Sequence, residues 1–191
     1  MSINQKTQEH ASTNGKNWFK IGVGLIVCLL FRLIPFRPPN VEPILATQMP
    51  MSKVYGPLLG FAFGFLSIVL FDVLVGRVGV WTIITASTYG FLGVWSVFYF
   101  KKRAMKRKNF VMFSIWGTLV YDAITGLTVG PLFFNQPFML ALVGQIPFTV
   151  LHLIGSITFA FFVSPLVYKY LVTNQSLDTY IDKLFIRVKN A

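Results

Sequence analysis

Tyr55–Gly79 constrains the fold of this chain more than any other stretch. Glycines recur at four-residue spacing, at Gly56, Gly60 and Gly64, before an apolar run that carries a single carboxylate, Asp72. Glycines at this spacing share one helix face and let a second backbone approach closely, as helices in lipid require. A carboxylate in such a helix is costly in hydrocarbon and indicates a functional site. The stretch therefore predicts a membrane-spanning helix with a packing surface at one end and a polar site at the other.

The composition of the whole chain agrees with a membrane protein. Hydrophobic residues make up 54% of the 191 residues and charged residues only 12%, which leaves too little polar surface for a soluble domain. The net charge of +11 does not indicate a nucleic-acid partner, because the bases lie in short clusters between apolar runs. We expect a multi-pass protein of the cytoplasmic membrane with the lipid bilayer as its surroundings.

Six apolar segments follow one another, and a spanning helix needs about 20 such residues. They are Trp18–Phe36, Glu42–Met51, Val54–Val75, Val80–Phe100, Phe110–Gly130 and Phe138–Leu171. The second is half a span long, and is either a short helix or a re-entrant piece enclosed by protein. Pro147 and Pro165 should kink or break the last. The prediction is an all-α protein with six transmembrane helices, the second one short, in a membrane domain over 18–171. A disordered cytoplasmic segment over 1–17 precedes it, and a cytoplasmic amphipathic tail over 172–191 follows it.

The basic residues predict the orientation of these segments. With six crossings, 14 of the 17 lysines and arginines fall on one side, including the run Lys101–Lys108. Only Arg32, Arg37 and Arg77 fall on the other side. The excess of bases marks the cytoplasmic side, so both termini should be cytoplasmic. The tail carries apolar residues at helical spacing with charges between them, which is typical of a helix lying on the membrane surface.

Polar side chains gather toward the outer end of this predicted topology, where we expect them to surround a small-molecule site that opens outward. The candidate substrate-binding residues are Asn40, Glu42, Asp72, Trp81, Tyr121, Asp122, Gln145 and His152. The two aromatic side chains in this set could stack on a ring-shaped ligand.

Less specific interpretations of these residues remain open. Asp72 and Asp122 could be interfacial carboxylates that are hydrated or paired with Arg77 and Arg32. His152 has no second His or Cys at ligand spacing, which favours a packed, hydrogen-bonded histidine over a metal ligand.

No serine, histidine and acid fall at a catalytic spacing, and no phosphate-binding loop is present. We therefore expect no catalytic residue, no cofactor and no metal, and a protein that is not an enzyme.

Several of these features together resemble one family. They are the Gly56-Pro-x2-Gly60-x3-Gly64…Asp72-x3-Gly76-x2-Gly79 pattern, the short second helix after a proline-rich turn, the basic loop after the fourth helix and Gly144-Gln-Ile-Pro-Phe148. From about Trp18 to Leu171 the chain is similar to S components, the substrate-binding membrane subunits of energy-coupling factor (ECF) vitamin transporters. The resemblance implies six helices and high-affinity capture of a vitamin or related micronutrient from outside. It also implies docking on a T component that two partner ATPases drive.

One departure from that family concerns docking. The family often carries an Ala-x3-Ala motif on its first helix for the T component, and the nearest equivalent here is Gly24-x3-Cys28. This pair is small-x3-small without being that motif, so docking through it is plausible. Small residues can also pack helices within the chain, and for the glycine ladder such packing is favoured over docking. The residues concerned are Gly24, Cys28, Gly56, Gly60 and Gly64.

A different class of function remains as the alternative. A scaffold protein like MreD of the cell-elongation machinery is similar in size and also has a Gly-rich helix ending in an aspartate and a glycine. A scaffold has no need for polar residues around one cavity, so the outward polar half favours the transport subunit.

Overall fold

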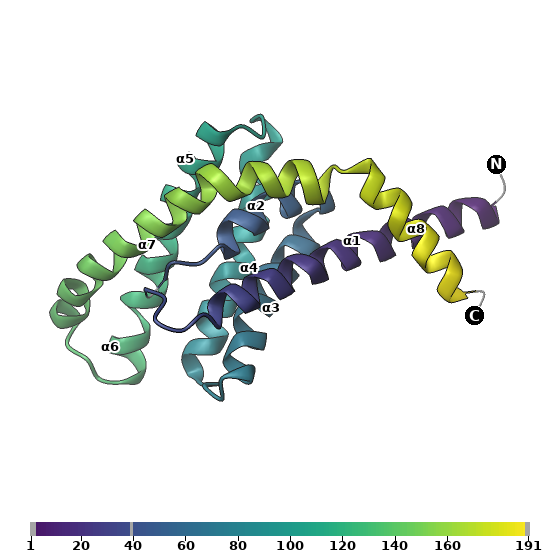
Figure 1. Cartoon of the computed structure of the whole chain (residues 1–191). Helices are drawn as coiled ribbons and strands as arrows, with labels where there is room; N and C mark the ends of the chain where they lie inside the picture. Colours follow the sequence, from purple (N-terminus) through teal and green to yellow (C-terminus); the bar gives the residue numbers. More distant parts are fainter. Residues whose placement is uncertain (1–2, 39, 190–191) are drawn as a thin grey trace.

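The computed structural model describes residues 3–38 and 40–189, where all regular structure is helical (Figure 1). Residues 1–2, 39 and 190–191, which belong to the predicted N-terminal segment, proline-rich turn and tail, lie outside the described residues. The elements are α1 (Ile3–Arg32), α2 (Ile44–Tyr55), α3 (Pro57–Leu74), α4 (Val80–Lys101), α5 (Arg107–Gly126), α6 (Val129–Phe133), α7 (Phe138–Leu166), the π-helix η1 (Val167–Val172) and α8 (Gln175–Lys189).

The short helix α2 is enclosed by the rest of the protein. Every residue from Ile44 to Ser52 is buried, and α2 contacts α1, α3, α4, α5, α7 and η1. Its 12 residues extend about 18 Å, well short of the roughly 30 Å hydrocarbon core. The side-chain amide of Gln48 donates hydrogen bonds to the carbonyl oxygens of Gly60 and Tyr89, at 2.9 and 2.8 Å. The half-length segment is thus a helix that protein surrounds.

The glycines of α3 provide the closest helix contacts in the fold. A Cβ atom placed on Gly64 would lie 2.6 Å from the carbonyl oxygen of Tyr89 on α4. One placed on Gly93 of α4 would lie 2.3 Å from the carbonyl oxygen of Gly60. Gly56 instead has a φ of 93° and turns the chain from α2 into α3. The glycine pattern therefore serves packing within the chain, against a glycine of α4 that the sequence analysis did not single out.

Gly24 and Cys28 on α1 also face inward. A Cβ on Gly24 would lie 2.6 Å from the methyl carbon of Met51 on α2, and Cys28 is fully buried. The thiol of Cys28 lies 3.7 Å from the hydroxyl oxygen of Thr47 on α2. This small-x3-small pair therefore packs α1 on α2.

Four stretches of the described chain are long and apolar enough to cross a membrane. They are Pro57–Leu74, Val80–Lys101, Arg107–Phe133 and Phe138–Val172. These stretches correspond to the third to sixth predicted segments and support a multi-pass membrane protein. Neither α1 nor α2 is among them, so six crossings and the orientation of the termini stay predictions.

Three boundaries differ from those predicted. The helix α1 begins at Ile3, inside the segment over 1–17 whose disorder stays a prediction. The fifth segment divides into α5 and α6, with a break before Val129. The helix α7 runs through Pro147 and Pro165, and the π-helix η1 follows directly, because Pro165 cannot donate a backbone hydrogen bond.

The tail helix α8 lies beside the N-terminal half of α1 (Figure 1). Lys20 of α1 is 2% exposed, pairs with Asp178 at 2.6 Å and donates to the carbonyl oxygen of Val172 at 3.1 Å. Lys16 pairs with Asp182 at 2.7 Å. These pairs hold α8 on α1, because a buried ammonium group without its carboxylate would be costly.

Asp178→Ala should loosen this contact. Lys20 would keep only the Val172 carbonyl, so α8 should open more often, and limited proteolysis should remove the tail several-fold faster than in the wild type. Thr179→Ala, at an exposed position of the same helix, is the matched control and should leave the rate unchanged. Equal cleavage of all three proteins would contradict this role of Lys20 and Asp178.

Candidate functional site

Glu42 joins three parts of the fold in the interior. It is 8% exposed and lies in the connection from α1 to α2. Its Oε2 atom lies 3.1 Å from Nε of Arg32 and 3.9 Å from Nη1 of Arg37. Its Oε1 atom accepts a hydrogen bond of 2.9 Å from the hydroxyl of Tyr89 on α4. Since a buried carboxylate must be paired and hydrogen-bonded, Glu42 draws the connection inward against α4.

Arg32, at the end of α1, is held on three sides. Besides Glu42, its Nη1 atom donates to the carbonyl oxygen of Ser67 at 3.1 Å, and its guanidinium lies 3.9 Å from the ring centre of Phe71. Both contacts are on α3, so Arg32 ties α1 to α3 at the level of Glu42. Because the guanidinium of Arg32 both forms an ion pair and stacks on an aromatic ring, its position is fixed.

Asp122 and His152 form a second buried pair, between α5 and α7. Nδ1 of His152 donates to Oδ1 of Asp122 at 2.8 Å, and the two residues are 2% and 1% exposed. Oδ2 of Asp122 is buried and has no hydrogen-bond partner among the described residues. A buried carboxylate oxygen left in this state is costly, and a ligand with an N–H or O–H group would satisfy it.

Aromatic rings connect the two pairs. The ring of Tyr121 lies 4.4 Å from that of Tyr89 and 5.6 Å, edge to face, from that of His152. Charged and aromatic side chains therefore run without interruption from α1 to α7. We call this set the buried polar cluster; it consists of Arg32, Glu42, Tyr89, Tyr121, Asp122 and His152.

A cavity of about 310 Å³ that is widely open to the surface lies between α5 and α7 beside this cluster. Asp122, Gln145 and Thr149 are its polar lining residues, and aliphatic side chains provide the rest. The amide of Gln145 donates to the hydroxyl of Thr149 at 3.2 Å and packs against Gly126. A mostly apolar cavity with a few converging polar groups, at the lower end of the usual size range, is typical of small-molecule sites.

The structure brings most of the predicted binding residues together. Glu42, Tyr121, Asp122 and His152 belong to the buried polar cluster, and Gln145 lines the adjoining cavity. Asn40, in the connection before α2, has a φ of 61° and a buried Nδ2 atom without a partner among the described residues. His152 is a packed, hydrogen-bonded histidine, and no group of metal-ligand residues occurs among the described residues.

Asp72, near the end of α3, and Trp81, at the start of α4, flank the turn between these two helices. The hydroxyl of Thr82 donates to Oδ2 of Asp72 at 2.5 Å. The indole N–H of Trp81 donates to the carbonyl oxygen of Arg77 at 3.1 Å, and the side chain is 40% exposed. These contacts stabilise the turn.

Sequence reasoning left the partners of the acids open. Asp72 and Asp122 were considered as partners of Arg77 and Arg32, but the structure pairs Asp72 with Thr82 and Asp122 with His152. Tyr89, whose hydroxyl donates to Glu42, is not among the candidate residues of the sequence analysis. A signal for Tyr89 exists: Thr82, Ala86, Tyr89, Gly93 and Ser96 recur at helical spacing and are all buried.

Comparison with known proteins gives one match. A family model described as "ECF-type riboflavin transporter, S component" matches residues 20–121, which is more than half of the chain. The matched region includes Arg32, Glu42, Tyr89 and Tyr121 and ends just before Asp122. No curated protein and no solved structure gives a significant match.

Proposed function

The chain belongs to the family of S components of ECF-type riboflavin transporters, and on this premise we propose that it captures a small organic micronutrient from outside the cytoplasmic membrane. Such a subunit is part of a transporter and is not an enzyme. Delivery would proceed through a T component and two partner ATPases, with six crossings and both termini in the cytoplasm. The scaffold alternative resembling MreD gains no support from the family match.

The unpartnered Oδ2 atom of Asp122 is the observation that carries this proposal. Asp122 lines the cavity between α5 and α7, and His152 holds its other oxygen. The site therefore offers a positioned hydrogen-bond acceptor that the protein itself does not use. A ligand donor would remove the cost of that buried oxygen, which favours binding of a molecule with an N–H or O–H group.

Aromatic and amide groups beside Asp122 narrow the class of ligand. Gln145, in the cavity lining, offers both a donor and an acceptor, and the buried ring of Tyr121 lies behind the lining, against His152. A planar heteroaromatic compound with hydrogen-bonding edges fits this combination. A flavin has an aromatic ring system, an imide N–H and a hydroxylated chain, so riboflavin is the first ligand to test, followed by other vitamins and their precursors.

The test is ligand binding to the purified protein in detergent, by mass spectrometry of co-purified molecules and by fluorescence titration. Asp122→Asn should weaken binding by roughly 10- to 100-fold, because a hydrogen bond to a charged group contributes about 1.5–3 kcal/mol. Asp182→Asn makes the same change on α8, away from the cavity, and should bind as the wild type does (Figure 1). Absence of a co-purified molecule together with no saturable binding across the panel would refute the proposal.

A further inference from the structure

The tail helix α8 carries its acidic side chains on one face and the bases Lys183 and Arg187 on another. Asp178 and Asp182 both turn to α1, where they pair with Lys20 and Lys16. Ile181 lies between them and is fully buried. Both carboxylates of α8 thus form ion pairs with α1. They do not offset the positive charges on the opposite face of α8.

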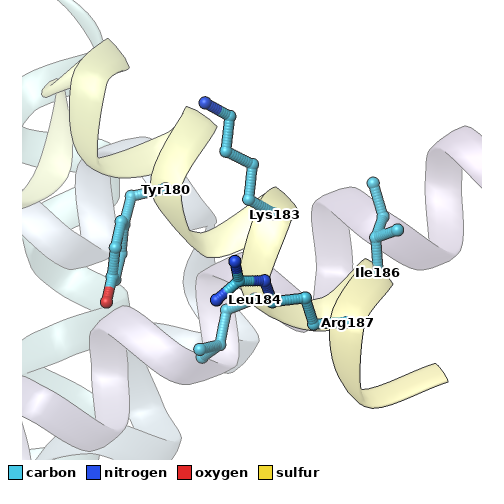
Figure 2. A pocket seen from close by; sticks show the side chains of 5 residues that line it. All are labelled: Tyr180, Lys183, Leu184, Ile186 and Arg187. Carbon is cyan, nitrogen blue, oxygen red and sulfur yellow. The ribbon is translucent and has the colours of Figure 1, made fainter. Parts of the chain in front are cut away.

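The opposite face combines bases with exposed apolar side chains (Figure 2). Figure 2 shows the five residues that line a shallow groove of about 490 Å³ along this face: Tyr180, Lys183, Leu184, Ile186 and Arg187. We call these five residues the outer face of α8. Tyr180 and Ile186 are 65% and 60% exposed, and together with Leu184 they form an exposed apolar patch beside the bases.

Neither base of the outer face forms an ion pair with a described residue, so both charges are available to a partner. Spacings of three, four and seven residues place Tyr180, Lys183, Leu184 and Arg187 in one stripe along the helix. A stripe of bases beside aromatic and aliphatic side chains is typical of helices that lie in the membrane interface.

The position of α8 in the chain favours lipid over a soluble partner. The preceding candidate span, Phe138–Val172, ends three residues before α8 begins at Gln175. So short a connection keeps α8 close to the surface where that span leaves the membrane. We propose that the outer face of α8 binds anionic lipid headgroups of the cytoplasmic leaflet, with Lys183 and Arg187 on the phosphates and Tyr180, Leu184 and Ile186 at the acyl boundary.

Two contacts connect α8 to the membrane domain. Asp178 reaches the buried Lys20 of α1, and Lys20 also binds the carbonyl oxygen of Val172 at the end of η1. Lipid on the outer face of α8 would therefore help to hold α1, at Lys20, against the end of η1 at the membrane surface.

The test places an environment-sensitive fluorophore on Tyr180→Cys in the full chain, reconstituted in phosphatidylcholine vesicles with or without phosphatidylglycerol. Cys28, the only cysteine of the sequence, is fully buried, and labelling of the unsubstituted protein measures any background. We expect a blue-shifted emission with phosphatidylglycerol that high salt reverses, because salt screens charges at the membrane surface.

The variants make the experiment specific for the outer face. Lys183→Gln and Arg187→Gln should each lower the apparent affinity for phosphatidylglycerol roughly fivefold. Lys101→Gln with Lys102→Gln removes two charges from the loop between α4 and α5, and should leave the emission unchanged. The same emission with and without phosphatidylglycerol overturns the proposal. So does a label that stays in water until T-component and ATPase subunits are added, which would assign the face to protein.

Discussion

Gly93→Ala should destabilise the protein by about 1–3 kcal/mol or prevent its folding, the usual range for an overpacked core. The added methyl group would lie 2.3 Å from the carbonyl oxygen of Gly60 and 2.4 Å from Nε2 of Gln48. The backbone of α3 cannot yield as a flexible side chain could, so α3 and α4 would have to separate. That movement would also disturb the hydrogen bond from Gln48 to Gly60. Thermal unfolding in detergent, followed by tryptophan fluorescence, measures the effect.

Gly144→Ala is the matched control for this change. Gly144 lies within α7, and a Cβ atom there would have no neighbour within 4 Å. Alanine is the better helix former by about 1 kcal/mol, so this variant should unfold at the wild-type temperature or slightly above it. If Gly93→Ala and Gly144→Ala unfolded at the same temperature, the close crossing of α3 and α4 would not limit stability.

Glu42→Ala should cost about 3–5 kcal/mol, the usual loss when one partner of a buried ion pair is removed. Arg32 would lose its carboxylate in the protein interior, and the hydroxyl of Tyr89 would lose its acceptor. The connection between α1 and α2 would also lose its attachment to α4. We expect a low yield of folded protein and, for what folds, a strongly reduced unfolding temperature.

A double variant distinguishes the cost of an unpaired buried charge from the cost of lost packing. Replacing both partners, as Glu42→Gln with Arg32→Met, removes the unpaired charge and keeps similar volumes, so it should be more stable than Glu42→Ala. Recovery will be partial, since Arg32 also donates to Ser67 and stacks on Phe71. A double variant no more stable than Glu42→Ala would mean that Glu42 acts through contacts other than its arginine.

The helices were predictable where apolar runs of spanning length end at bases, glycine or proline. The predicted Val80–Phe100 and the observed Val80–Lys101 differ by one residue, and the tail helix Gln175–Lys189 follows the expected spacing. Pro165 indicated a disturbance of the last helix, but neither its π-helical form after Leu166 nor the break after Gly126 was predictable. Local hydropathy does not contain that information.

The members of the site were more predictable than their partners. Polar residues of the outer half were recognisable because charge is costly in hydrocarbon, and Glu42, Tyr121, Asp122 and His152 do meet. Their pairings depend on contacts between distant parts of the chain; Glu42 and Tyr89, for example, are 47 residues apart. Whether the assembled residues bind a substrate stays a prediction until ligand binding is measured.

The enclosed helix α2 has a consequence for biosynthesis. The ribosome makes α2 early, but one of the partners of α2 is made much later. The hydroxyl of Ser164 on α7 donates a hydrogen bond to the carbonyl oxygen of Ala46 on α2, and these residues are 118 positions apart. At about 5–20 residues per second, the ribosome needs roughly 6–24 s to make the intervening chain. During that time α2, which is too short to span the bilayer and carries the polar side chain of Gln48, can contact α1, α3, α4 and α5 but lacks its contacts with α7 and η1. Until α7 is made α2 stays incompletely enclosed, so late truncations should expose the newly made protein to membrane proteases.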